Sequence, residues 1–183
     1  VTEQIGKVQH TSNLYYTEPC ALLAQKLCER TGMKRVFFSN SGAEANECAI
    51  KVARKYAAEK KGEAYFTVVT LENSFHGRTL TTLAATGQEH EAMIATATEQ
   101  KAAAIMIECI QGEGGVLPLD ADYVKAVAKF AADNDIILIV DEVQTGNGRT
   151  GKLYSYMNFG IEPDVVSTAK GLAGGLPIGA TLL

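Results

Sequence analysis

Short apolar runs alternate with longer amphipathic stretches along the 183-residue chain, and this rhythm restricts its fold more than any other feature. The apolar runs are rich in β-branched residues, as in 136–140, and have the length of buried strands. The longer stretches carry apolar residues at helical spacing, as in 43–60. Strands that alternate with helices favour a parallel sheet between helices. We therefore predict an α/β fold with a mainly parallel sheet flanked by helices.

The same patterns place the individual elements. Helices are expected at 19–30, 43–60, 79–85 and 121–132, and strands at 35–39, 64–70, 103–109, 136–140, 164–168 and 178–183. Gly32 is placed to end the first helix, and Asp120 can cap the start of the last. Pro and Gly gather at strand ends, where open α/β sheets bind their ligands. Candidate functional residues should therefore lie directly after strands.

Composition excludes several classes of function. Lys plus Arg number 17 and Asp plus Glu 21, so the net charge of −4 argues against a nucleic-acid or anionic-membrane partner. No apolar run approaches the roughly 20 residues that a membrane helix needs. The four cysteines fit no zinc-binding spacing and the three histidines are scattered, so we predict no metal site. We expect the cysteines to be buried free thiols of a cytoplasmic protein.

A turn of small residues, Ser39–Ala43, lies between a predicted strand and the longest predicted helix. Such a turn leaves the first amides of the helix free and exposes the positive end of its dipole. Ser41 adds a hydroxyl donor. The segment therefore suits a phosphate group, although a capped strand-to-helix turn that binds no ligand would have the same sequence pattern.

Two further segments carry polar side chains after strands. In 74–79, Phe75 offers a ring that can stack on a planar ligand, and Arg78 offers a guanidinium suited to a carboxylate. In 107–115, Glu108 and Glu113 stand beside three glycines at the end of a strand. A core Phe, a surface Arg and a solvated glycine-rich loop are the structural alternatives.

An acid and a lysine each follow a predicted apolar strand. Asp141 comes directly after 136–140, where an acid is costly to bury unless it is paired, so we expect it to have a cationic partner. The structural alternative, an exposed acid in a loop, fits its neighbour Glu142 better than Asp141. Lys170 has small or apolar neighbours on both sides, and a lysine removed from water becomes a better amine nucleophile. Asp164, at the other end of its strand, should be structural.

Residues 146–151 match G-x-G-x-x-G, which raises a nucleotide-binding oxidoreductase as an alternative. The dinucleotide fingerprint needs its first glycine tight against a strand and a helix that opens within the motif. Four residues separate Asp141 from Gly146, and 152–156 does not have the pattern of that helix. We therefore expect no dinucleotide site here.

Taken together, a phosphate cradle, a stacking ring, a buried acid and an amine nucleophile are the parts that pyridoxal phosphate (PLP) requires. The stretches that carry them read SNSGAEANE, SFHGRT, IECIQGEGG, VDEVQTGNGRTG and STAKGLAGGLPIGA, in this order between 36 and 180. In these motifs the chain resembles the class III (fold type I) PLP-dependent aminotransferases, and within them most closely the acetylornithine branch. The resemblance implies the large, cofactor-binding domain of that fold.

The resemblance implies roles around the cofactor ring and phosphate. Ser41, Gly42 and Ala43 resemble the phosphate-binding turn of the family. Phe75 resembles the residue that stacks on one face of the ring, and Val143 the residue that packs on the other.

It also implies the chemical groups of the site. Asp141 resembles the partner of the pyridine nitrogen, Gln144 the residue that bonds the phenolic oxygen, and Lys170 the Schiff-base lysine. We predict that Asp141 and Lys170 are the catalytic pair.

Three more positions match residues that bind the substrate in the family. Arg78 resembles the arginine that binds the α-carboxylate. Glu108 and Glu113 resemble the active-site acids, of which the second often gates an arginine that binds glutamate.

The activity that the resemblance implies is ping-pong transfer of the terminal amino group of N-acetylornithine to 2-oxoglutarate, in arginine biosynthesis, by a cytoplasmic homodimer. Succinyldiaminopimelate, succinylornithine, ornithine and 4-aminobutyrate remain alternative substrates. Residues 1–183 would be part of the large domain, without the family's N-terminal segment, its C-terminal small domain and a stretch near 88–91. A catalytically incompetent fragment is therefore a further alternative.

Overall fold

A computed structural model describes residues 1–12, 14–85 and 92–183, and the predicted interruption near 88–91 lies outside these residues. The helices are α1 (Thr2–Ile5), α2 (Glu18–Thr31), α3 (Gly42–Lys61), α4 (Leu80–Ala84), α5 (Ala92–Glu99), α6 (Ala121–Asp133) and α7 (Tyr156–Phe159), with a 3₁₀ turn, η1 (Lys170–Ala173). The strands are β1 (Val36–Ser39), β2 (Thr67–Thr70), β3 (Ala102–Ile107), β4 (Ile110–Gln111), β5 (Leu117–Pro118), β6 (Ile137–Asp141), β7 (Val165–Thr168) and β8 (Gly179–Leu182).

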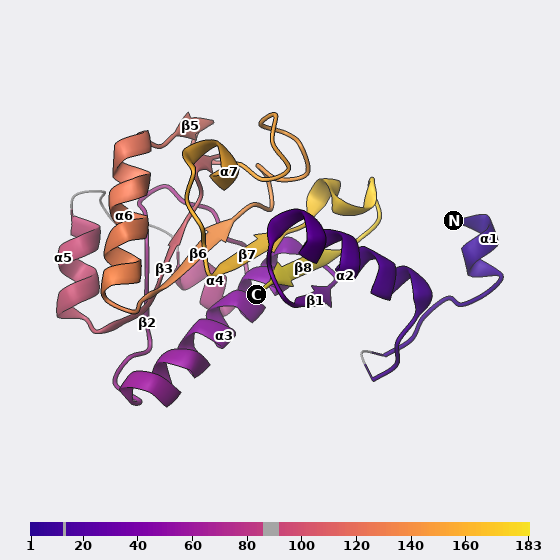
Figure 1. The fold of residues 1–183 in the computed structure, drawn as a ribbon, viewed down its shortest axis with the longest axis horizontal. Coiled ribbons are helices and arrows are strands. Elements are labelled where there is room, and N and C mark those ends of the chain that lie inside the picture. Colours follow the sequence, from indigo (N-terminus) through magenta and orange to yellow (C-terminus); the bar gives the residue numbers. More distant parts are fainter. Residues whose placement is uncertain (13, 86–91) are drawn as a thin grey trace.

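The main sheet has six strands in the order β1-β8-β7-β6-β3-β2 (Figure 1). Strands β2, β3, β6 and β7 pair in parallel, whereas β8 is antiparallel to both β7 and β1. Five of the six strands therefore point the same way, which confirms the predicted mainly parallel sheet. Their carboxyl ends share one edge, and the loops that leave this edge are where a parallel sheet builds its binding site.

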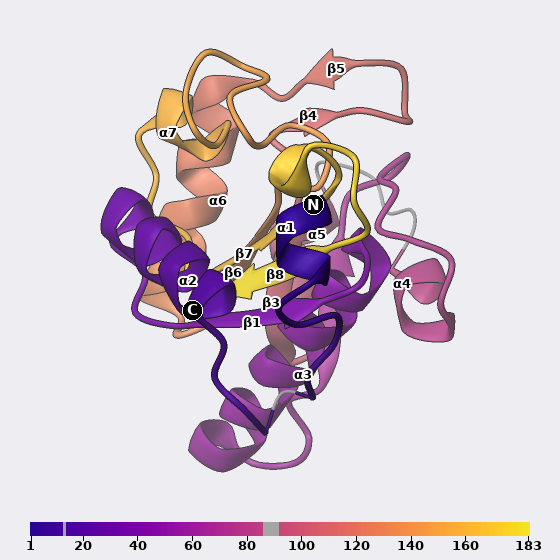
Figure 2. The same cartoon turned by 90° about the vertical axis from the view of Figure 1, so that its right-hand side faces the viewer.

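Helices cover both faces of the sheet, so the domain has three layers (Figure 2). On β3, Ala104 and Met106 face α3, while Ile105 and Ile107 belong to the core formed with α2, α5 and α6. Successive side chains of a strand point to opposite faces, so a strand covered on both sides is apolar throughout. All six residues of β3 are buried, as this arrangement requires.

Capping groups set the helix ends where the sequence indicated. The Ser41 hydroxyl accepts the Glu44 N–H at 3.2 Å at the start of α3, and the Asp120 carboxylate accepts the Asp122 and Tyr123 N–H groups at the start of α6. Gly32, with φ of 78°, ends α2 in the left-handed conformation that glycine adopts without strain.

Several features differ from the expectations. The hairpin β4–β5 and the short helices α5 and α7 were not anticipated. Strands of two residues and a single helical turn such as α7 leave no periodic pattern, and the eight residues of α5 give only a short one. The four cysteines are free, but only Cys109 is buried and Cys20 is exposed. Within the ranges that the structure describes, no helix is long and apolar enough to cross a membrane. Helix α1 lies apart from the sheet (Figure 1).

Candidate active site

Every predicted site residue lies at the carboxyl end of a parallel strand of the main sheet or in the segment that follows it. The turn that starts α3 follows β1, the loop with Phe75 and Arg78 follows β2, Glu108 follows β3, and Lys170 follows β7. Asp141 is itself the last residue of β6. Segments up to about 130 residues apart in the sequence therefore meet at one edge because the sheet order places these strands side by side.

These segments enclose one cleft. Its inner part, about 50 Å³, is lined by the start of α3, the Phe75–Gly77 loop, both predicted glutamates, and the Asp141–Gln144 segment with Lys170. Six of these lining residues also border a wider cavity of about 820 Å³, which adds Ser41 and Arg78. The sequence therefore identified a set of residues that the fold brings together.

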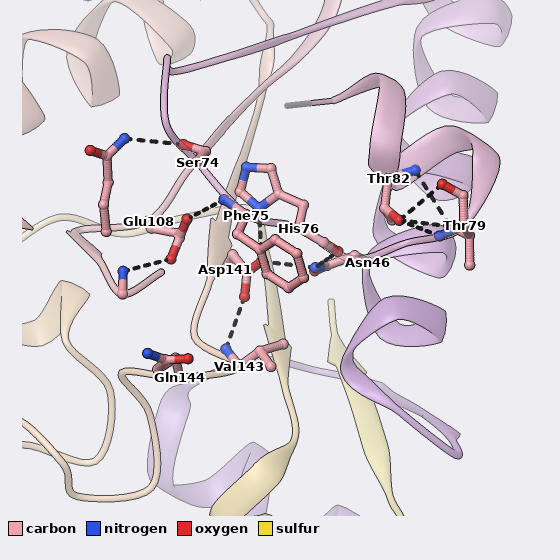
Figure 3. Close-up of polar contacts among 12 residues, drawn as sticks. Asn46, Ser74, Phe75, His76, Thr79, Thr82, Glu108, Asp141, Val143 and Gln144 are labelled. Atoms are coloured by element: carbon pink, nitrogen blue, oxygen red, sulfur yellow. Dashed lines mark hydrogen bonds and ion pairs between the residues drawn. The ribbon is translucent and has the colours of Figure 1, made fainter. Parts of the chain in front are cut away.

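Asp141 forms the floor of the inner cleft and is only 4% exposed (Figure 3). Its Oδ2 accepts the Asn46 amide at 2.8 Å and contacts His76 Nδ1 at 2.8 Å, while its Oδ1 accepts the Val143 N–H at 2.9 Å. The expected cationic partner is thus an imidazole, charged only when protonated, assisted by two neutral donors. Asp164 behaves as predicted, because its carboxylate accepts the Leu138 N–H at the other end of the strands.

The turn at the start of α3 is both a helix cap and a candidate anion site. The first amides of a helix have no intrahelical partner, so those of Gly42 and Ala43 are available. A Cβ on Gly42 would stand 2.6 Å from a methyl carbon of Val143, so only glycine lets the turn lie this close to the Asp141–Gln144 segment. The capped turn is therefore observed, and the anion site stays a prediction.

Glu108 is buried next to the Phe75 loop (Figure 3). Its carboxylate accepts the Phe75 N–H at 2.8 Å and the Gly112 N–H at 3.1 Å. Burial, and secondarily the nearby charge of Asp141, raises the pKa of Glu108. Phe75 itself is 38% exposed and lines both parts of the cleft, so its ring borders the inner cavity.

Lys170 corrects one expectation, because it is exposed and not desolvated. It has a positive φ of 42° where η1 leaves β7, and its amine donates to the Gln144 side-chain oxygen. Small neighbours in the sequence do not bury a side chain when the segment lies at the rim of a cleft. Arg78 and Glu113 are exposed as well and border the same cleft.

Glu142 is fully buried, so the exposed-loop alternative, which fitted it better than Asp141, applies to neither acid. Its carboxyl group accepts the Thr145 hydroxyl at 2.5 Å, the Ser155 hydroxyl at 2.6 Å and the Tyr156 N–H at 2.8 Å. Burial raises the pKa of Glu142. The local sequence around Glu142 does not predict these contacts, because two of the three donors come from a segment more than ten residues downstream.

Asn46 and His76 were also missed, although both contact Asp141. Asn46 falls within the buried stripe of α3 with Ala45, Ala49 and Ala53. A polar residue inside an otherwise apolar helical stripe is the signal that could have identified it. His76 lies directly after Phe75, which the sequence did identify, and it lines the same cleft.

The segment 146–151 is not a dinucleotide fingerprint. It consists of turns, with the Gly146 N–H bonded to the Glu142 carbonyl, and the next helix, α7, begins only at Tyr156. No helix N-terminus therefore faces a pyrophosphate site in this motif, as expected from the sequence.

Comparison with known proteins gives consistent findings. The chain matches the aminotransferase class-III family over residues 1–97 and 88–183. It is 52% identical to the acetylornithine aminotransferase of Haemophilus ducreyi, covering 100% of this chain and 52% of that protein. It is 43% identical to a succinylornithine transaminase of Salmonella paratyphi A, covering 100% of this chain and 49% of that protein.

A solved structure agrees in fold. The N-acetylornithine aminotransferase of Stenotrophomonas maltophilia superposes with a TM-score of 0.86 at 40% identity, over 99% of this chain and 50% of that one. The chain thus spans about half the length of the curated relatives that it matches.

Proposed function

The chain belongs to the class-III aminotransferase family, and from this premise we propose that it binds PLP and moves the terminal amino group of N-acetylornithine to 2-oxoglutarate. The observation that carries the proposal is the convergence of every predicted site residue on one cleft with Asp141 at its floor. The similarity to acetylornithine aminotransferases supports this choice of substrate.

The side chains of the cleft fit PLP. A carboxylate has about four acceptor sites, and the donors around Asp141 use three of them, so Oδ1 keeps one for a ring N–H. Phe75 and Val143 both border the inner cavity and supply apolar walls for a planar ring. The start of α3, with Ser41, Gly42 and Ala43, supplies amides and a positive dipole end for the phosphate.

When bound, PLP supplies an electron-withdrawing ring that stabilises negative charge on the substrate carbon. In the proposed role, Asp141 holds the proton on the ring nitrogen, and a buried carboxylate does this better than an exposed one because water does not screen it. Lys170 provides the amine that holds the cofactor and then moves the substrate proton. Gln144 contacts this amine and orients it from the neighbouring loop.

The rim of the cleft suits a substrate with two kinds of charged group. Arg78 is exposed at the wide cavity and would bind the α-carboxylate in a bidentate manner. Glu108 and Glu113 line the inner part, one buried and one exposed. Glu113 is placed to attract a cationic side chain, while Glu108 also holds the Phe75 loop through its backbone amide.

The proposal extends to the whole protein. Residues 1–183 would form part of the large cofactor-binding domain of a cytoplasmic homodimer that serves arginine biosynthesis, with neither nucleic acid nor membrane as a partner. A second candidate is succinylornithine, favoured by the 43% identity to a succinylornithine transaminase. Ornithine, succinyldiaminopimelate and 4-aminobutyrate are the remaining substrates to be distinguished.

A substrate panel tests the proposal on the full-length protein. With 2-oxoglutarate as acceptor, acetylornithine should give the highest kcat/KM among acetylornithine, succinylornithine, ornithine, succinyldiaminopimelate and 4-aminobutyrate. Lys170→Ala should abolish turnover and the visible absorbance of bound PLP. Lys129→Ala is the matched control, because that exposed lysine pairs with Asp133 on α6.

Other results would redirect the proposal. Failure of the wild-type protein to bind PLP would refute it, and a preference for another amine would change the substrate. Turnover by the full-length protein but not by residues 1–183 alone would identify this segment as an incompetent fragment. Titration with NAD should show no binding.

A further inference from the structure

Asn46 on α3 joins two walls of the cleft with a single amide group. Its Nδ2 donates to the His76 carbonyl at 2.7 Å and to Asp141 Oδ2 at 2.8 Å, which uses both of its hydrogens (Figure 3). The first bond holds the backbone of the loop that carries Phe75, and the second holds the acid at the end of β6. One side chain of a third element therefore bonds to both, beside the direct contact between His76 and Asp141.

The cost of burying this amide indicates that its two bonds matter. Asn46 is 1% exposed, and its Oδ1 has no hydrogen-bond partner among the residues that the structure describes. An unsatisfied buried oxygen costs free energy that a leucine of similar size would avoid. The neighbouring buried positions of α3, such as Ala45 and Ala49, carry only apolar side chains.

The same amide decides which oxygen of Asp141 remains available. Asn46 and His76 together occupy Oδ2, whereas Oδ1 accepts only the Val143 N–H. Removal of the Asn46 amide would free an acceptor site on Oδ2 and leave that oxygen held by His76 alone. The orientation of the carboxylate would then rest on two contacts and not three.

We propose that Asn46 is a positioning residue that clamps the Phe75–Gly77 loop to Asp141 and fixes the orientation of that carboxylate toward the ring nitrogen of PLP. The inference rests on the proposed function for the identity of the ligand. The clamp itself exists between residues of this chain and can be tested without a cofactor.

The experiment compares Asn46→Leu with a matched control on the full-length protein. Thr181→Val removes the buried hydrogen bond from Thr181 Oγ1 to the Ala45 carbonyl, 2.8 Å long, on the same turn of α3. It therefore loosens α3 without touching Asp141 or the cleft. Three quantities are measured: the Kd for PLP, the circular dichroism of bound PLP in its visible band, and amide hydrogen exchange of residues 72–79 in the apo protein.

Asn46→Leu should raise the Kd for PLP by about tenfold or more, because it removes a hydrogen bond to a charged group and releases the loop. It should also weaken the visible circular dichroism and speed exchange in 72–79 by about tenfold. Thr181→Val should leave all three close to the wild-type values. A normal Kd and dichroism in Asn46→Leu, or equal changes in both variants, would overturn the inference.

The two proposals fail in different ways. If wild-type protein binds PLP and Asn46→Leu binds it equally well, only the role of Asn46 is wrong. If wild-type protein does not bind PLP, the proposed function is wrong, and hydrogen exchange in the apo protein still decides whether the clamp exists.

Discussion

Replacement of Glu142 by alanine should destabilise the protein strongly, although the residue does not line the cleft. Its carboxyl group ties the segment that follows β6 to the segment 155–156, so three donors converge on it. The intervening backbone carries Val143 and Gln144 into the cleft. Loss of this group should therefore affect both stability and the geometry of the site.

The structure sets the size of the effect. Each buried donor left without a partner costs about 1–3 kcal/mol. The Thr145 and Ser155 hydroxyl oxygens are 3.3 Å apart and can still bond each other, whereas the Tyr156 N–H loses its acceptor. The void left by the side chain destabilises the folded state further, whereas removal of a buried carboxyl group stabilises it somewhat. We therefore expect Glu142→Ala to lower the free energy of unfolding by about 2–4 kcal/mol.

Glu142→Gln is the matched control and carries a pH dependence. Its side-chain oxygen can accept from Ser155 and Tyr156, and its amide can donate to Thr145, so its stability should lie within about 1 kcal/mol of the wild type. Burial raises the pKa of Glu142 in the folded state. The stabilisation of the protonated wild type is therefore complete below the unfolded pKa of about 4.3 and decreases as the pH rises through the folded pKa.

The assay is urea unfolding of the full-length protein, followed by far-ultraviolet circular dichroism, at a series of pH values from about 4 upward. The stability of wild type relative to Glu142→Gln should fall as the pH increases and then level off. Glu108, whose pKa is also raised, is present in both proteins, so its contribution cancels. Parallel pH curves, or a wild-type free energy of unfolding for Glu142→Ala, would refute the reasoning.

Three further predictions concern other contacts. Gly42→Ala should lower the free energy of unfolding by about 1–3 kcal/mol, because the new methyl group would collide with Val143. Adding Val143→Ala should recover part of that loss in a double-mutant cycle, and simple additivity of the two changes would contradict the close approach. Asp120→Ala should cost about 0.5–2 kcal/mol through loss of the α6 cap, whereas Asp120→Asn should cost less in the same unfolding assay. Arg78→Lys should raise KM for the amino donor more than it lowers kcat, because a lysine cannot bind a carboxylate in a bidentate manner; an unchanged KM would exclude this role.

Much of the fold and of the site could be predicted because the relevant information is local. The alternation of strands and helices, the Asp120 cap and the Gly32 stop each depend on a few adjacent residues. The cleft also followed, since residues after parallel strands must share one edge. The hairpin β4–β5 could not be predicted, because two-residue strands gain their order from the surrounding loops and not from their own pattern.

The sequence by itself determined the type of sheet, the ends of the main helices and the edge at which Asp141 and Lys170 meet. Only the tertiary structure decided the environment of individual side chains there. Glu142 is buried because the chain returns at Ser155 to cover it, while Lys170 stays exposed because no later segment among the described residues covers the start of η1. Periodicity and capping act over one or two turns of chain, whereas burial and hydrogen-bond partners depend on which distant segments the packed sheet brings together.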